Sequence, residues 1–70
     1  MSSMTITVNG KRHTAESLTL VALLRENGIT ENSTGVAVAV NSNVVPKRTW
    51  DSVRLSDGDI IEIINAVQGG

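Results

Sequence analysis

Apolar and polar residues alternate at the start of the chain, over Met4-Thr5-Ile6-Thr7-Val8, with the period of a half-buried β-strand. Asn9-Gly10 follows, and this pair favours a two-residue type I′ turn because both positions need positive φ. Lys11 to Glu16 then reads as a mostly polar second strand. Together these residues predict an N-terminal β-hairpin.

A short helix is expected after the hairpin. Leu20, Leu23 and Leu24 fall at i, i+3 and i+4, which places them in one apolar stripe. Thr19 precedes the stripe as an N-cap, and Gly28 follows it where a left-handed residue would end the helix. The polar, Gly-terminated stretch 31–35 predicts a loop.

The second half of the chain predicts more strands. Val36 to Val40 forms one, with valines on one face and alanines on the other. Asn43 to Pro46 is expected to be a short edge strand, because proline cannot donate to a central ladder. Residues 47–54 are expected to be irregular or to form one helical turn, with Trp50 anchoring them on the sheet.

Asp57-Gly58-Asp59 predicts a turn, and the last strand is expected over 60–67. The order of elements favours an α+β fold with one main helix on one face of a mixed sheet of four to five strands. The β-grasp (ubiquitin-like) fold has this arrangement. We therefore expect a single domain over 1–70, from which 66–70 protrudes as a flexible tail.

The last strand carries apolar residues on both faces. Ile61 and Ile63 are expected to point to the core, so Ile60 and Ile64 lie on the opposite face with Glu62 between them. Either a helix or loop covers this second face, or it is an exposed apolar patch of the kind that docks a protein partner. Val67 would lie at the edge of such a patch.

Composition and charge exclude several classes of function. Six basic and seven acidic residues give a net charge of −1, which is no footprint for nucleic acid. No apolar stretch approaches the roughly 20 residues that span a bilayer, and no secretory signal opens the chain. We expect a cytoplasmic protein that binds neither nucleic acid nor membrane.

The side chains offer little catalytic chemistry. The chain has no cysteine, and its one histidine, His13, lies on a polar strand without companions. Asp57 and Asp59 are interpreted as turn formers, and no spacing of ligands indicates a metal site. We expect no catalytic residue, no metal and no bound cofactor.

The Gly69-Gly70 ending suggests a different kind of function. It follows an apolar strand with Gln68 between, and five residues from Ala66 could extend roughly 17 Å from the body. Glycine lacks Cβ and permits close backbone approach, so the tip could enter a narrow channel in a partner enzyme. Gly70 would then supply a carboxylate for activation, and Val67, Gln68 and Gly69 would give access to it.

The chain resembles the ThiS family of sulfur carriers in thiazole (thiamine) biosynthesis, from Ile6 to the end. The landmarks that carry this resemblance are Val8-Asn9-Gly10, Val38-Ala39-Val40-Asn41, Val44-Val45-Pro46-Lys47 with Trp50 three places later, Asp57-Gly58-Asp59, and Gly69-Gly70. The Val-Pro-basic stretch with its tryptophan is the landmark that best distinguishes the thiamine branch from its relatives among the sulfur carriers. The last two motifs are shared with the molybdopterin-synthase small subunit.

The resemblance implies a defined chemistry at Gly70. An E1-like adenylyltransferase would use ATP and magnesium to form an acyl-adenylate there, and a persulfide sulfur donor would displace AMP. Thiazole synthase would then accept sulfur from the thiocarboxylate. Ile60, Glu62 and Ile64 would contact partners, as would Lys47 and Arg48 in the surface that the activating enzyme meets. The alternatives are a molybdopterin-synthase small subunit and a ubiquitin-like tag or interaction module.

Overall fold

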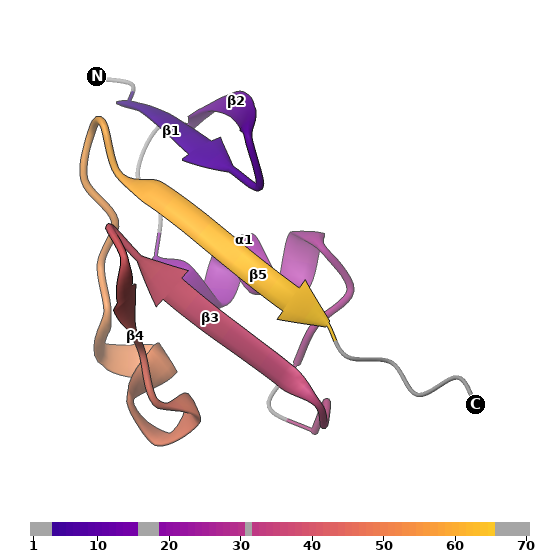
Figure 1. Ribbon diagram of the computed structural model, residues 1–70. Coiled ribbons are helices and arrows are strands. Elements are labelled where there is room, and N and C mark those ends of the chain that lie inside the picture. The colour runs from indigo at the N-terminus through magenta and orange to yellow at the C-terminus, as the bar shows by residue number, and fades with distance from the viewer. Residues whose placement is uncertain (1–3, 16–18, 31, 66–70) are drawn as a thin grey trace.

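The computed structural model describes residues 4–15, 19–30 and 32–65, which form a mixed sheet with one α-helix on one face (Figure 1). The elements are β1 (Met4–Val8), β2 (Lys11–Ala15), α1 (Leu20–Glu26), β3 (Val36–Val40), β4 (Asn43–Val44), the 3₁₀-helix η1 (Lys47–Ser52) and β5 (Ile60–Asn65). The strand order is β2-β1-β5-β3-β4, in which β1 and β5 are parallel and the other neighbours antiparallel. The predicted α+β architecture is confirmed.

Local signals in the sequence determine the first two turns of the fold. Asn9 and Gly10 both have positive φ, at 50° and 85°, as a type I′ turn requires. The Thr19 hydroxyl accepts the N–H of Ala22 at 3.2 Å, so it caps α1 as expected. Gly28 ends the helix with a φ of 79°, and its N–H donates to the carbonyl of Arg25 at 3.0 Å.

One apolar core lies between α1 and the sheet. Its buried members come from every layer of the fold: Ile6, Val8, Leu20, Leu23, Leu24, Ile29, Val38, Trp50, Leu55 and Ile61. The helix stripe thus packs on the face of the sheet to which β1, β3 and β5 contribute their alternate residues. This arrangement leaves the other sheet face without a covering helix among the described residues (Figure 1).

The segment after Pro46 is more regular than expected. Instead of one helical turn, η1 runs over six residues, which is two turns of a 3₁₀-helix. The buried Trp50 indole holds this segment, because its Nε1–H donates to the carbonyl of Val45 at 3.1 Å. The role of Trp50 as a structural anchor is confirmed. Strand β5 ends at Asn65, and the remaining predicted strand residues, 66 and 67, lie outside the described part.

Candidate functional site

Strand β5 directly precedes the predicted tail residues in the sequence, so the contacts that hold β5 fix the chain up to the candidate site. The strand begins at a turn built by two carboxylates, as the sequence predicted for them. Asp57 Oδ1 accepts the N–H of Thr5 at 2.7 Å, and Asp59 Oδ2 accepts the N–H of Ser56 at 2.7 Å. Asp57 thereby connects the turn to the start of β1, and the start of β5 is fixed against its neighbour.

Asn41 holds the same end of β5 from the opposite side. Its Nδ2 donates to Asp59 Oδ1 at 2.9 Å, and its Oδ1 accepts the N–H of Ile60 at 2.9 Å. The residue lies in the β3–β4 turn with a φ of 52°. Sequence analysis used Asn41 only as a landmark of the family, because its partners are 18 and 19 positions away and leave no local signal.

Asn9 performs a similar function near the end of β5. Its Oδ1 accepts the N–H of Ile63 at 2.8 Å, and its Nδ2 donates to the carbonyl of Ile63 at 3.2 Å. The amide side chain thus imitates a backbone peptide and continues the β1–β5 pairing beyond Val8, the last strand residue of β1. On the other side, the β3 ladder continues to the pair Val36 and Asn65.

Strand β5 is therefore held by hydrogen bonds along its length, up to Asn65, the last described residue. The tail residues themselves, Val67, Gln68, Gly69 and Gly70, lie outside the described residues. Their assignment as the modified and access residues stays a prediction.

The sheet face opposite α1 carries exposed apolar side chains on β5 and at the sheet edge. Ile60 is 50% exposed and Ile64 is 63% exposed, with exposed Glu62 between them on β5. We call this surface the open face, and it comprises Ile60, Glu62, Ile64, Ala37, Ala39 and Val44. The structure decides between the two readings of the sequence: within the described residues, neither helix nor loop covers these side chains.

Strand pairing explains the composition of the open face. Ile64 lies opposite Ala37, and Glu62 lies opposite Ala39, which in turn pairs with Val44 on β4. The small alanines leave the larger β5 side chains standing above the surface, and Val44 is 75% exposed at the edge. Ile60, Ile64 and Val44 are therefore exposed apolar side chains on one face of the sheet, with Glu62 among them.

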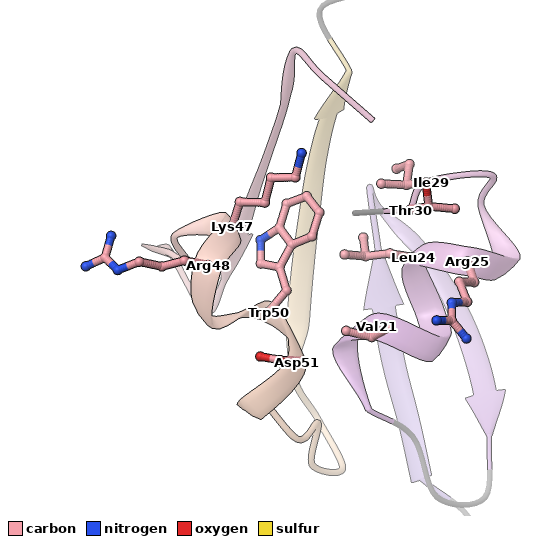
Figure 2. Close-up of a pocket in the computed structure, with 9 residues that line it drawn as sticks. All are labelled: Val21, Leu24, Arg25, Ile29, Thr30, Lys47, Arg48, Trp50 and Asp51. Carbon is pink, nitrogen blue, oxygen red and sulfur yellow. The ribbon is translucent and has the colours of Figure 1, made fainter. Parts of the chain in front are cut away.

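Lys47 and Arg48 belong to a different part of the molecule from the β5 residues. Both lie on η1 in the helix layer, beside a groove between η1 and α1 (Figure 2). Lys47 Nζ lies 5.9 Å from the centre of the Trp50 ring and also donates to the carbonyl of Ser33. Arg48 points away from the groove into solvent (Figure 2). The five predicted partner contacts therefore form two surfaces.

The described residues offer no alternative centre for metal chemistry. Among them, no three or more histidine, aspartate or glutamate side chains gather as potential metal ligands. His13 is exposed on β2, the strand on which the sequence placed it. No helix in the described ranges has the length and apolar character needed to cross a bilayer.

Similar proteins agree with this architecture. A crystal structure of the thiamine biosynthesis protein ThiS from Geobacter metallireducens is 34% identical, covers 96% of this chain and 100% of that one, and superposes with a TM-score of 0.75. The solution structure of a thiamine biosynthesis protein from that organism superposes with a TM-score of 0.77, at 34% identity over 96% of this chain and 88% of that one. The fold therefore defines a β-grasp, ubiquitin-like protein.

Sequence comparisons place the chain more narrowly. The model of the ThiS family matches residues 4–70, and the chain belongs to this family of small sulfur carriers. A thiazole synthase from Paramagnetospirillum magneticum (strain ATCC 700264 / AMB-1) is 40% identical over 68 residues, which are 96% of this chain and 20% of that protein. The uncharacterized protein ycf40 of Porphyra purpurea is 36% identical over 69 residues, 97% of this chain and 94% of that one.

Proposed function

We propose that this protein carries sulfur for thiazole formation in thiamine biosynthesis as a thiocarboxylate on Gly70. The observation that carries the proposal is the family match, which runs through Gly69-Gly70 to the last residue. Support also comes from β5, which hydrogen bonds from Asn9, Asn41 and β3 hold up to the point of tail departure.

The chemistry begins with activation, because a carboxylate is a poor electrophile. A partner adenylyltransferase of the E1-like class joins the Gly70 carboxylate to AMP from ATP with magnesium, and pyrophosphate leaves. The terminal sulfur of a persulfide then attacks the acyl carbon and AMP leaves. A second thiol cleaves the sulfur–sulfur bond, so the thiocarboxylate stays on Gly70 and the donor becomes a disulfide. The carrier contributes the reacting group and the docking surface.

Thiazole synthase is the proposed acceptor of the sulfur. In the Paramagnetospirillum protein of that name, a segment similar to this chain makes up 20% of the length. A carrier-like segment and a larger remainder therefore occur in one polypeptide there. Covalent linkage raises the effective concentration of two parts that must meet, which supports a functional encounter between such partners.

The open face is the proposed docking surface for the enzymes that act on the tail. Ile64 is next to Asn65, the last described residue, so this apolar surface continues to the tail exit. An enzyme that takes the tail into a channel would bury Ile60 and Ile64 at the same time. Glu62 lies between them, and a polar contact from the partner to its carboxylate would fix how the partner is aligned on this surface.

Intact-mass spectrometry after incubation with the adenylyltransferase, ATP, magnesium and a persulfide donor tests the chemistry. The expected product is heavier by the difference between sulfur and oxygen, and fragmentation should place this difference on Gly70. Deleting Gly70 should leave thermal unfolding unchanged and abolish adenylation. Continued adenylation at the new terminus would refute the assignment. Gly69→Ala should keep the reacting group but slow the reaction, since a Cβ narrows the fit.

Pull-down with thiazole synthase and with a molybdopterin-synthase large subunit tests whether the carrier serves thiamine or molybdopterin biosynthesis. The thiocarboxylate form should bind thiazole synthase and transfer its sulfur there. Exclusive binding to a molybdopterin-synthase large subunit would overturn the assignment to thiamine biosynthesis. Isopeptide conjugates of Gly70 to lysines of other proteins would instead support a ubiquitin-like tag.

A further inference from the structure

The groove between α1 and η1 has a defined lining and volume. Its volume is about 220 Å³. The lining side chains come from the helix, from the segment that follows it and from η1 (Figure 2): Val21, Leu24, Arg25, Ile29, Thr30, Lys47, Arg48, Trp50 and Asp51. The open face does not include this groove, and among the lining residues only Lys47 and Arg48 were predicted to contact a partner.

The inner surface of the groove is apolar and accepts an apolar group. Leu24, Ile29 and Trp50 are buried members of the core, and the half-buried Val21 lies beside them. The indole N–H of Trp50 is already bonded to the carbonyl of Val45, so it is not free to bind an occupant. An engineered apolar cavity of about 150 Å³ in another protein binds benzene, so this groove has room for one aromatic or branched aliphatic side chain. It is too small for a drug-sized ligand, whose pockets usually span about 300–1,000 Å³.

The surroundings of the groove are positively charged. Arg25 comes from the last turn of α1 and Lys47 comes from η1, and Asp51 is the one carboxylate among the lining residues. Two cations, Arg25 and Lys47, thus lie at the groove, whereas the Arg48 side chain points away from it into solvent (Figure 2). Lys47 and Arg25 belong to opposite walls (Figure 2), so cations border the apolar opening from both sides.

We propose that this groove docks a peptide segment of a partner protein in which one large apolar side chain is flanked by acidic residues. The apolar side chain enters between Trp50 and Leu24, and the acidic neighbours meet Lys47 and Arg25. Charge complementarity selects an acidic segment, and the volume limits the anchor to one side chain. This interaction does not depend on Gly70, and it leaves the open face free for a second contact.

A fluorescence titration of the full chain tests the docking proposal. Trp50 is the only tryptophan, and it lines the groove, so its emission reports on occupancy directly. The probe is a capped peptide with one phenylalanine between pairs of aspartates. We expect saturable binding with a Kd below about 1 mM, and added salt should raise this Kd. Binding should be lost when alanine replaces the phenylalanine of the peptide.

Two double variants with equal charge change separate the groove from general attraction. Lys47→Gln with Arg25→Gln removes one lysine and one arginine at the groove, and we expect about five- to tenfold weaker binding. Lys11→Gln with Arg12→Gln removes the same two residue types from exposed positions on β2, and binding should stay within twofold.

Three results of the titration would overturn the proposal, and one result on the free chain would do so as well. The three titration results are no saturable change in Trp50 emission, equal weakening in both double variants, and equal binding of a peptide with lysines in place of its aspartates. Self-association of the free chain that the groove variant alone abolishes would assign the groove to a second copy and overturn a peptide partner. None of these outcomes bears on thiocarboxylate formation, which is measured separately by mass.

Discussion

Ile60 and Ile61 are neighbours of identical chemistry on opposite faces of β5, so replacing each with alanine separates stability from docking. Ile61 has no exposed surface and pairs with Val8 of β1 on one side and Val40 of β3 on the other. Ile60 is 50% exposed on the open face. We predict that Ile61→Ala destabilises the fold strongly and that Ile60→Ala mainly weakens partner binding.

The magnitudes follow from burial. Truncating a buried isoleucine to alanine costs about 2–5 kcal/mol, because the transfer free energy is lost and a cavity remains. A domain of 70 residues is stable by about 3.5–10.5 kcal/mol at about 0.05–0.15 kcal/mol per residue, so Ile61→Ala removes a large share of the free energy of unfolding. Ile60→Ala loses only part of its burial and some strand propensity, which together cost about 0.5–1 kcal/mol.

Urea unfolding monitored by Trp50 fluorescence measures both changes. Because Ile61→Ala could leave little folded protein, Ile61→Val provides a graded variant with an expected cost of about 0.5–1.5 kcal/mol. The midpoint should fall while the slope stays constant. Saturation kinetics of adenylation with the Ile60→Ala carrier should show a raised KM and an unchanged kcat.

Two results would refute this reasoning. Equal destabilisation by Ile60→Ala and Ile61→Ala would mean that the two faces of β5 are equally buried. An unchanged KM for Ile60→Ala would remove the open face from the docking surface. Arg12→Ala, at an exposed position of β2, provides a control for non-specific effects on the kinetics.

Three further changes test the local contacts that shape the site. Asn9→Gly keeps the positive φ but loses both side-chain hydrogen bonds to Ile63. The free energy of unfolding measured in urea should therefore fall by about 1–3 kcal/mol, and an unchanged value would refute the role of the amide. The Cβ added by Gly28→Ala has no atom within 4 Å, so the expected loss of about 1–2 kcal/mol in the free energy of unfolding comes from the positive φ alone. An unchanged midpoint of thermal unfolding would contradict this expectation. Thr19→Ala removes the N-cap of α1 and should cost about 1 kcal/mol by the same unfolding assay, whereas Thr19→Ser should restore most of it.

Local chemistry made much of the fold predictable. The Asn9-Gly10 turn, the Thr19 cap and the Gly28 end of α1 depend on residues within four positions of one another, and all are confirmed. Alternation along β5 also predicted correctly that Ile61 faces the core. Terminal glycines and family landmarks identified the candidate tail, and the family assignment is confirmed by the match over residues 4–70.

Contacts between distant segments could not be read in the same way. The amide of Asn9 holds Ile63 across 54 positions, and the sequence indicated only that Asn9 favours a turn. The groove is another example, because Leu24 and Trp50 line it together. The sequence predicted Leu24 on the apolar stripe of the helix, but it predicted a less regular segment around Trp50 than η1. Its position depends on how η1 packs against α1, and no period in the chain encodes that.

The sequence by itself determined the elements, the ThiS family and the residues proposed to react, because periodicity, turn propensity and motif spacing are local properties. Tertiary structure alone decided that Ile60 and Ile64 stay exposed, since burial depends on whether another layer covers that face. It also placed Lys47 and Arg48 on η1 in the helix layer, on a different surface from these β5 residues. Strand order and layer packing set these relations through contacts between residues far apart in the chain.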